Sequence, residues 1–556
     1  MEHLGNLFAF IGGLGMFLFG MNTMAEGLQK SAGNRMKQLL GYLTNNRILG
    51  VLVGALVTAI IQSSSATTVM VVGFVNAQII NLTQAAGVIM GANIGTTITA
   101  WLVSASEWSA ALKPEFIAPL ILGIGAFVLM FSKKEKYHKF SEIAVGFGIL
   151  FIGLSFMSDS ISMYRESPIF SNAFAILGGN PILGILTGAV VTAIIQSSSA
   201  SVGILQTLAM NGIVNWRSAV FITLGQNIGT CVTALLSSVG ANKTAKRAAT
   251  IHLLFNVLGA VLFGAIMFVF FIVNKELATS TISSTQISVF HTIFNITNTV
   301  ILFPFAGLLV KLSGKIVKDS GEEEEELDEE ELTIRHLDTR FMETPTFAFN
   351  SGMEEIIHMG AVTMKNFERV CHEMVKDKPS KERLERVDKT EHFINEMETM
   401  LAQYFVQVGT LPITEQQRIT VNNLHFVIND IERIGDYVKN IAEFIERNAG
   451  IGGVFSDGAK KDLEQLGAKV CETIELSINA IGCDSPEIAD KAMAAEDEVD
   501  KLEAQIREKH INRLTKESCK VESGVLFLDI INCMEKIADH ANNMAKCVKN
   551  EHALHK

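Results

Sequence analysis

The chain has 556 residues, of which 48% are hydrophobic, and a formal net charge of −12. It is too long for one domain, and its charge implies no nucleic-acid partner. Nine carboxylates fall in the single run Glu322–Glu331, so the rest of the chain carries only about three net negative charges. The seven cysteines include no Cys-x-x-Cys pair, which favours reduced thiols over disulfides or a zinc site.

Up to about Lys318 the sequence consists of apolar runs of roughly 20 residues, the length that crosses a bilayer as helix. No Asp, Glu, Lys or Arg occurs between Ile48 and Ser106. Glycines in the first run suit close helix packing. The predicted spans are Leu7–Met24, Ala85–Val103, Phe116–Phe131, Ile143–Met163, Ala219–Ser237, Ile251–Val273 and Ile287–Val310.

One nine-residue stretch occurs twice in this half. Thr58–Ala66 reads Thr-Ala-Ile-Ile-Gln-Ser-Ser-Ser-Ala, and the same letters return 134 residues later at Thr192–Ala200. With this offset, Asn46–Ala100 matches Asn180–Ala234 at about half of all positions. The membrane half is therefore an internal duplication. Four adjacent hydrogen-bonding side chains are costly in hydrocarbon, so the repeat predicts a protein-enclosed polar cavity.

The arms that flank each Gln-Ser-Ser-Ser run are too short to span a membrane. Each has about 15 residues, roughly 22 Å as helix against a hydrocarbon core of about 30 Å, so we expect re-entrant helical hairpins with the serines at their tips. Loops rich in basic residues at 133–139, 243–247 and 311–318 should be cytoplasmic. Counting spans between these loops makes two repeats, at about 5–131 and 142–273, run in opposite directions, with an extra span at 287–310.

Several hydroxyls beside two helix N-termini form a site suited to an oxyanion. A catalytic serine is excluded because neither hairpin contains a base and no Gly-x-Ser-x-Gly surrounds the serines. Serines that merely pack helices remain the alternative. The expected ligands are Gln62, Ser63, Ser64, Ser65, Gln196, Ser197, Ser198 and Ser199.

A second repeated motif, Gly-x-Asn-Ile-Gly-Thr, supplies neutral oxygens. Gly95 and Gly229 are expected to break their helices locally and free backbone carbonyls, while packing glycines are the alternative. An oxygen cage of low charge suits Na⁺. The side chains that would complete it are Asn93, Thr96, Asn227 and Thr230.

Two His-x-x-Phe-Asn elements follow, at His252–Asn256 and His291–Asn295. The spacing of four places each His and Asn on one helical face. Interhelical hydrogen bonding is favoured over substrate contact for both pairs.

Beyond Lys318, an acidic linker at 319–340 leads to a charged, helical half at 341–556. Asn429–Asp436 aligns with Asn532–Asp539 at an offset of 103, which favours two three-helix bundles. The predicted helices are 345–376, 380–408, 414–448, 457–482, 486–515 and 517–550, separated by Pro and Gly breaks.

Each bundle carries a carboxylate pair on one helical face. The pairs are Glu432 with Asp436 and Glu535 with Asp539. Related by the repeat, they could converge on metal ions, although a solvated surface is the commoner role of such a pair.

At these motifs the membrane half resembles the type II sodium-phosphate cotransporters, over about residues 5–312. The doubled Gln-Ser-Ser-Ser, the Gly-Ala-Asn-Ile-Gly-Thr motif and the His-x-x-Phe-Asn elements carry the resemblance. The second half resembles PhoU, a helical regulator of phosphate uptake, whose Glu-x-x-x-Asp motifs can bind metal ions. One departure is that Phe116–Phe131, the first-repeat counterpart, lacks the His-x-x-Phe-Asn element.

The resemblance implies an all-α, polytopic membrane protein rather than an enzyme. Residues 1–318 would be the transport domain, lying in the inner (plasma) membrane, with a cytoplasmic regulatory domain after the linker. The implied function is Na⁺-coupled symport of inorganic phosphate by alternating access, with a divalent or transition metal as a further ligand of the tail. A phosphate sensor that signals through the tail and a transporter or exporter of another oxyanion are the rival functions. The oligomeric state is left open, a homodimer being one option.

Overall fold

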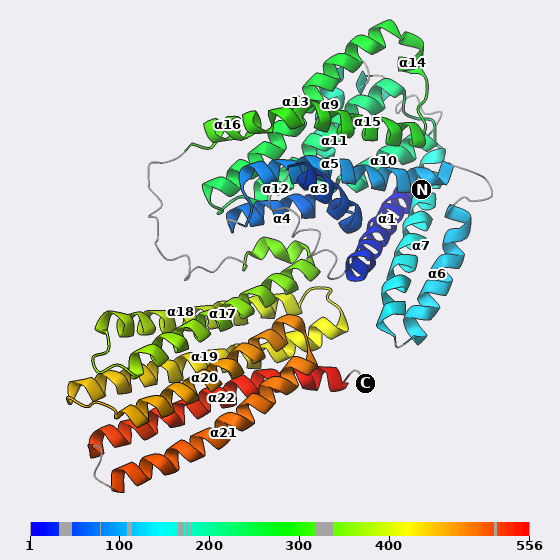
Figure 1. Cartoon of the computed structure of the whole chain (residues 1–556). Helices are drawn as coiled ribbons and strands as arrows, with labels where there is room; N and C mark the ends of the chain where they lie inside the picture. Colours follow the sequence, from blue (N-terminus) through cyan, green and yellow to red (C-terminus); the bar gives the residue numbers. More distant parts are fainter. Residues whose placement is uncertain are drawn as a thin grey trace. The chain divides into compact units, whose positions relative to one another are not determined.

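The structure is a computed structural model that describes residues 2–32, 47–77, 79–107, 114–132, 134–164, 172–173, 176–177, 180–318, 337–515 and 520–554. Within these ranges the chain is helical, with one isolated β-bridge between Asn215 and Thr281. The contacts divide it into two compact units (Figure 1). The first, called the membrane unit, contains the described residues up to 318 and also 338–347. The second, called the tail, contains Leu337 and the described residues from Ala348 onward.

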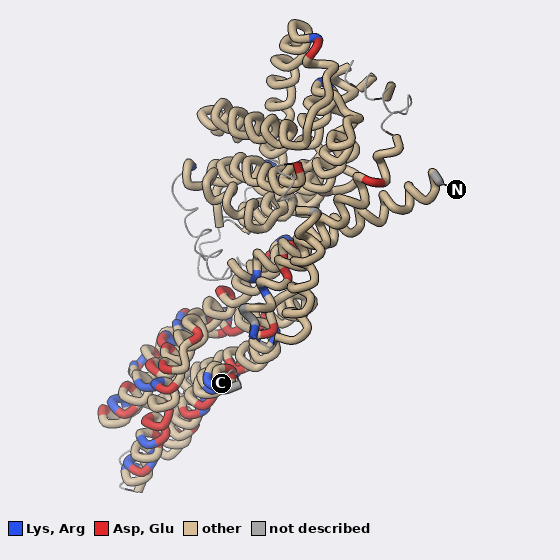
Figure 2. Tube along the Cα trace, turned by 90° about the vertical axis from the view of Figure 1, so that its right-hand side faces the viewer, with Lys and Arg blue, Asp and Glu red and all other residues tan. Residues whose placement is uncertain are grey.

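The membrane unit is built from long apolar helices, and six of them are long and apolar enough to cross a bilayer. Figure 2 shows this unit almost free of charged residues, whereas they are dense in the tail. The protein is therefore a multi-pass membrane protein. The helices are α1 (Glu2–Ala32), α3 (Arg47–Ile61), α4 (Ser64–Asn76), α5 (Leu82–Ser104), α6 (Pro114–Phe131), α7 (Glu135–Ser162), α9 (Pro181–Ile195), α10 (Ser198–Met210), α11 (Trp216–Gly229), α12 (Cys231–Ser237), α13 (Lys243–Val273), α14 (Lys275–Thr279), α15 (Ser284–Leu302) and α16 (Ala306–Ile316).

Each Gln-Ser-Ser-Ser run lies where two short helices meet. Gln62 and Gln196 both have φ of 56°, in the left-handed region that non-glycine residues seldom adopt. This turn reverses the chain, because Thr58 then donates to Thr67 across it at 3.0 Å. The second pair repeats the contact between Thr192 and Ser201 at 2.8 Å. We call α3–α4 the first hairpin and α9–α10 the second hairpin.

Glycines bring equivalent helices of the two repeats into close contact. A Cβ on Gly13 of α1 would lie 2.9 Å from the carbonyl oxygen of Gly153 of α7, and one on Gly20 would lie 2.7 Å from that of Gly146. The pairing runs in opposite directions along the two helices, so α1 and α7 are antiparallel. At the end of this contact, Lys30 pairs with Glu142 at 2.7 Å.

The expected helix break at Gly95 is wrong. Helix α5 runs unbroken through this residue, and a Cβ there would lie 2.5 Å from the carbonyl oxygen of Ala55. Gly95 is therefore a packing glycine that allows α3 and α5 to touch. Gly229 makes the equivalent contact with Ala189, 2.5 Å away, although α11 does end at this residue.

The open ends of the two hairpins lie at opposite ends of α13. Next to the first hairpin, Asn242, which caps the start of α13, donates its backbone N–H to Asn76 Oδ1 at 2.9 Å. Next to the second, Trp216 donates to the carbonyl of Ser280, just beyond α14, at 3.1 Å. As α13 has 31 residues, or about 46 Å of helix, these two contacts lie far apart along it.

The tail consists of six long helices (Figure 1), close to the predicted ranges. Ser and Thr caps begin several of them, including Ser380, Thr414 and Ser456. Residues 338–347, which span the boundary expected at 340/341, group with the membrane unit. Linker residues 319–336 lie outside the described residues. The helices are α17 (Pro345–Met374), α18 (Lys381–Gly409), α19 (Glu415–Gly450), α20 (Asp457–Cys483), α21 (Pro486–Thr515) and α22 (Val521–Leu554).

Candidate functional site

The tips of the two hairpins touch. Ser64 Oγ and Ser198 Oγ lie 3.3 Å apart, and both side chains are buried. These serines occupy equivalent positions in the two repeats, 134 residues apart. Contact between equivalent residues brings the two copies of the motif to one buried point, and the α1–α7 glycine contacts likewise join corresponding segments of the duplication. The duplicated motif therefore forms one site rather than two.

The serines of each tip have different local roles. Ser63 and Ser197 cap α4 and α10, accepting the N–H of Ala66 at 3.1 Å and of Ala200 at 3.2 Å. A cap satisfies only one of the unpaired N–H groups at a helix start. The remaining N–H groups, with the positive ends of two helix dipoles, converge where Ser64 and Ser198 meet. Such an arrangement favours an anion.

The two glutamines differ although their backbones match. Gln62 is buried, and its Oε1 accepts a hydrogen bond from Thr99 at 3.0 Å, whereas Gln196 is exposed. Access to the tips is therefore unequal on the two sides.

Thr99 is a candidate site residue that the sequence motifs do not include. It lies on α5, is buried, and joins the hairpins by donating to Gln62 and accepting from Ser199 Oγ at 3.3 Å. Its position one turn after the Gly-Ala-Asn-Ile-Gly-Thr motif was the available signal, because residues three and four apart share a helical face.

The four residues expected to bind sodium are all buried. Thr96 donates its hydroxyl to the Ala92 carbonyl at 2.9 Å, and Asn93 donates Nδ2 to the Ile89 carbonyl at 2.9 Å. Thr230 donates to the Asn227 carbonyl at 2.7 Å. These bonds use donor hydrogens and leave oxygen lone pairs, the groups that a cation needs.

Asn227 belongs to a wider side-chain network. It donates Nδ2 to Asn295 Oδ1 at 2.7 Å, and its Oδ1 lies 3.1 Å from His291 Nε2. Asn256 donates to Cys231 Sγ at 3.4 Å. The interhelical hydrogen bonding expected of the His-x-x-Phe-Asn elements is thus confirmed for His291, Asn295 and Asn256. His252 Nδ1, by contrast, has no hydrogen-bond partner among the described residues.

Gln226 offers a further neutral oxygen. Its Nε2 donates to Ser201 Oγ of the second hairpin at 3.0 Å, while its buried Oε1 has no protein partner. A buried acceptor without a donor is costly, unless a cation or water fills the place.

The tail carboxylates gather within each bundle. Burial, together with the neighbouring charges of Asp436 and Glu398, raises the pKa of Glu432. Burial and the charge of Asp539 raise the pKa of Asp500. Each expected pair therefore gains an acidic neighbour from another helix of its own bundle, an arrangement that a cation would relieve.

Basic side chains accompany both expected pairs. Arg433 lies 3.4 Å from Asp436, and Lys536 lies 3.2 Å from Glu535 and 2.9 Å from Asp539. A metal ion would have to compete with these ion pairs.

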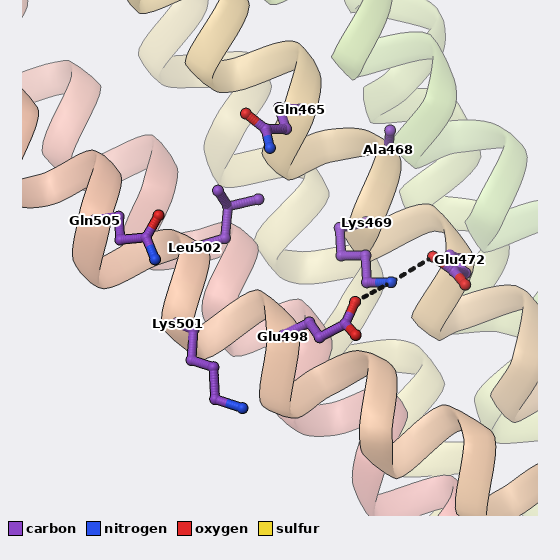
Figure 3. Close-up of a pocket in the computed structure, with 8 residues that line it drawn as sticks. All are labelled: Gln465, Ala468, Lys469, Glu472, Glu498, Lys501, Leu502 and Gln505. Carbon is purple, nitrogen blue, oxygen red and sulfur yellow. Dashed lines mark hydrogen bonds and ion pairs between the residues drawn. The ribbon is translucent and has the colours of Figure 1, made fainter.

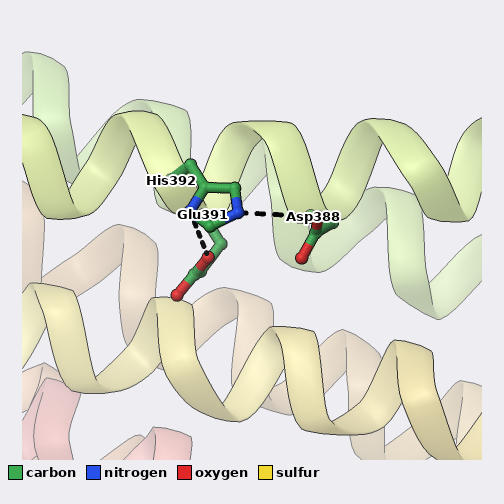
Figure 4. A group of neighbouring side chains, drawn as sticks. All are labelled: Asp388, Glu391 and His392. Atoms are coloured by element: carbon green, nitrogen blue, oxygen red, sulfur yellow. Dashed lines mark ion pairs between the residues drawn. The ribbon is translucent and has the colours of Figure 1, made fainter.

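Among the described residues, one group of three side chains has metal-ligand atoms close together, namely Asp388, Glu391 and His392 (Figure 4). Lys439 lies 3.0 Å from both carboxylates. Its ammonium pairs with both carboxylates and offsets one of their two negative charges, so a metal ion would have to compete with it here as well.

A surface groove lies between α20 and α21 (Figure 3). Its central Lys469 pairs with Glu472 at 2.8 Å and with Glu498 at 2.5 Å. The charge of Lys469 is thus neutralised within the groove. The groove is therefore a weaker anion site than the hairpin tips.

Comparison with known proteins adds family relationships. Residues 16–159 and 167–290 match the family described as "Na+/Pi-cotransporter", and residues 356–445 and 463–548 match the "PhoU domain". The chain is 24% identical over 528 residues to the Salmonella typhimurium "Putative inorganic phosphate export protein YjbB", covering 94% of this chain and 93% of that protein. It is 33% identical over 105 residues to the Homo sapiens "Sodium-dependent phosphate transport protein 2B", covering 18% of this chain and 15% of that protein. A crystal structure of PhoU from Pseudomonas aeruginosa is 15% identical with a TM-score of 0.35, over 37% of this chain and 97% of that chain.

Proposed function

Because the chain belongs to the Na⁺/Pi-cotransporter family and carries PhoU domains, we propose that it couples the movement of inorganic phosphate across the membrane to Na⁺, by alternating access. The family is one of transporters, not enzymes. The observation that carries the proposal is the contact between Ser64 and Ser198, which joins two helix N-termini at one buried point.

Phosphate would bind between the hairpin tips. Each tip offers hydroxyls and backbone N–H groups at a helix start, and charge-assisted hydrogen bonds of this kind are short and strong. Gln62, Thr99 and Ser199 form a connected side-chain network around the tips. No Lys or Arg occurs from Ile48 to Ser65 or from Pro181 to Ser199. The negative charge of a divalent anion bound at the tips therefore has to be offset by a positive charge that the hairpins do not supply.

Sodium would supply that charge. The proposed ligands are neutral oxygens of Asn93, Thr96, Asn227 and Thr230, with Gln226 Oε1 added because it is buried and unpartnered. Neutral oxygens make a site that holds no buried charge while it is empty, whereas a bound Na⁺ without its anion is costly there. Binding of each ion then favours the other by direct electrostatic attraction, which is a physical basis for coupling.

Alternating access would come from two inverted repeats with re-entrant hairpins. Support comes from the antiparallel α1–α7 contact, the contact between equivalent serines, and the hairpins that open at opposite ends of α13. Basic residues near one end of α13, such as Lys246, suggest that the first hairpin opens to the cytoplasm. The last helix of the membrane unit, α16, would then end on the cytoplasmic side, and the tail that follows it would be cytoplasmic.

The tail would be a cytoplasmic regulatory domain that binds metal ions. The proposed ligands are Glu432, Asp436, Glu535 and Asp539, aided by Glu398 and Asp500. Oxygen ligands of this type suit a hard divalent cation.

Export of phosphate is a second candidate, since the relative that aligns over 94% of this chain is named for export. Alternating access permits either direction, and the ion gradients decide between them.

The deciding experiment is transport of radiolabelled phosphate in proteoliposomes. Uptake should require an inward Na⁺ gradient, and replacing Na⁺ with K⁺ or choline should abolish it. Unlabelled sulfate should compete poorly. Measuring phosphate efflux with the Na⁺ gradient reversed tests export. Phosphate binding without Na⁺-dependent accumulation would support a sensor and overturn the proposal.

A further inference from the structure

A short segment after the acidic run packs against the membrane unit. Residues 338–347, which we call the docking segment, contain the 3-10 helix η4 (Thr339–Glu343) and the first turn of α17. They group with the membrane unit, although α17 continues into the tail. Phe341, at the centre of the segment, is fully buried.

Polar contacts hold the docking segment at the ends of two helices. Asn76, the last residue of α4, donates Nδ2 to Asp338 Oδ2 at 2.9 Å. Arg340 Nε donates to the carbonyl of Ser237, the last residue of α12, at 2.8 Å, and its guanidinium also pairs with Asp338. A cation at the carbonyl end of a helix meets partial negative charge and is favourable there.

An aromatic cluster completes this contact. The ring centroid of Phe341 lies 5.4 Å from that of Phe74 and 4.9 Å from that of Phe347, and the Phe74 and Phe347 centroids are 4.8 Å apart. A Cβ on Gly73 would lie 2.8 Å from the Phe341 ring, so glycine leaves the room that the ring occupies. The surface of α4 at Gly73 and Phe74 is therefore complementary to the Phe341 ring. Aromatic pairs of this kind add to the stability gained by burial.

Helix α4 joins this contact to the candidate substrate site. It has 13 residues, begins at Ser64 and ends at Asn76, a length of about 20 Å. The last turn of α4, which contacts Phe341, and its first residue, which contacts Ser198, are thus two ends of one rigid element. Restraint at one end limits movement at the other.

The docking segment is also continuous with the tail. Phe347 lies in the first turn of α17, a helix of 30 residues that runs to Met374. No break separates the segment from the tail helix, so a change of tail conformation that moves the start of α17 would act directly on the aromatic cluster.

From these contacts we infer that the docking segment is an intramolecular latch. While it is seated against α4 and α12, it restrains the first hairpin; when the tail withdraws it, the hairpin is free to move and transport accelerates. This inference rests on the proposed transport function, because it assigns to that function a means of control.

The test uses the full-length protein in proteoliposomes, with three variants. Phe341→Ala should raise the initial rate of Na⁺-dependent phosphate uptake roughly fivefold or more, the lower end of typical coupling between sites. Thr339→Ala is the matched control, because this side chain is exposed on the same turn, and it should leave the rate unchanged. Asn76→Cys with Asp338→Cys, in a background without native cysteines, allows the segment to be fastened to α4 with a bifunctional methanethiosulfonate. Fastening should slow uptake, and a reductant should restore it.

Hydrogen exchange of α4 provides a readout that does not depend on transport. Phe341→Ala should speed exchange in the last turn of α4, and Thr339→Ala should not. A folded Phe341→Ala protein with unchanged or lower uptake would overturn the latch. Uptake that does not change when the two introduced cysteines are cross-linked would also overturn it. If Phe341→Ala fails to fold, the cross-linked variant alone decides the matter. If the unaltered protein shows no Na⁺-dependent uptake, the proposed function fails, whereas unchanged α4 exchange in Phe341→Ala would overturn the latch separately.

Discussion

Ser64 and Ser198 are the residues on which the candidate site depends most directly. Replacing both by Ala should remove two buried, charge-assisted hydrogen bonds, each worth about 1.5–3 kcal/mol. Apparent phosphate affinity in proteoliposome uptake should fall by at least about 100-fold. Ser160→Ala is the control, because Ser160 is equally buried but bonds only to a backbone carbonyl of α7. Unchanged affinity in the double variant would refute the assignment.

Thr99 tests whether the connection between the hairpins matters. Thr99→Val keeps the shape but leaves Gln62 Oε1 and Ser199 without this partner, at a cost of about 1–3 kcal/mol. We expect the KM for phosphate to rise about tenfold or more, and Thr99→Ser to restore it. Thr97→Val is the matched control on the same helix, since Thr97 donates only to the Ile94 carbonyl. An equal effect of both valine variants would mean that Thr99 is merely structural.

Glu432 tests the proposed metal site through pH. Burial and nearby carboxylates raise its pKa from the ordinary 4.5, so ionisation opposes the folded state. The contribution of the protonated Glu432 carboxyl to tail stability is fully present below pH 4.5 and is lost as pH rises through its raised pKa. At neutral pH, Glu432→Gln should therefore slow hydrogen exchange of α19 in the full-length protein, with no difference at lower pH.

A divalent cation should protect α19 of the unaltered protein and protect Glu432→Gln less. Glu446→Gln is the control, because Glu446 is exposed on the same helix. Equal protection of all three proteins would argue against a metal ion at Glu432.

At the scale of elements, α13 offers the sharpest test of topology. Lys246 near its start and Glu276 just beyond its end are both exposed. In a background without native cysteines, Lys246→Cys should react with an impermeant thiol reagent only from the cytoplasm and Glu276→Cys only from outside. Labelling of both from one side would mean that α13 does not cross the membrane. The proposal that the two hairpins open to opposite sides of the membrane would then be wrong.

For the whole molecule, the contacts of the docking segment determine where the chain should be cut to remove the tail. A cut after Phe347 keeps the docking segment, whereas a cut at the acidic run would expose Phe74 and leave Asn76 without Asp338. A protein ending at residue 347 should still fold and carry out Na⁺-dependent phosphate uptake, because both hairpins precede the cut. A truncated protein that is well expressed but inactive would instead make the tail an obligate part of the transporter.

Local features of the sequence were sufficient to predict most elements. Apolar runs, proline and glycine breaks and capping residues act over a few neighbours, so five tail helices were predicted within a few residues. The start predicted for the last helix, at 517, lies outside the described residues, and that helix is described from Val521 to Leu554. Sequence identity between Thr58–Ala66 and Thr192–Ala200 likewise revealed the duplication without any structure.

Contacts between distant segments depended on how the helices pack, and only the tertiary structure decided them. The sequence could not tell a helix-breaking Gly95 from a packing one, because the answer depends on the Ala55 carbonyl on another helix. Nor could it place Thr99 between the hairpins or Phe341 against Phe74, since these pairings join residues far apart in the chain. Residue type and spacing determined which groups were available, and packing selected which of them meet.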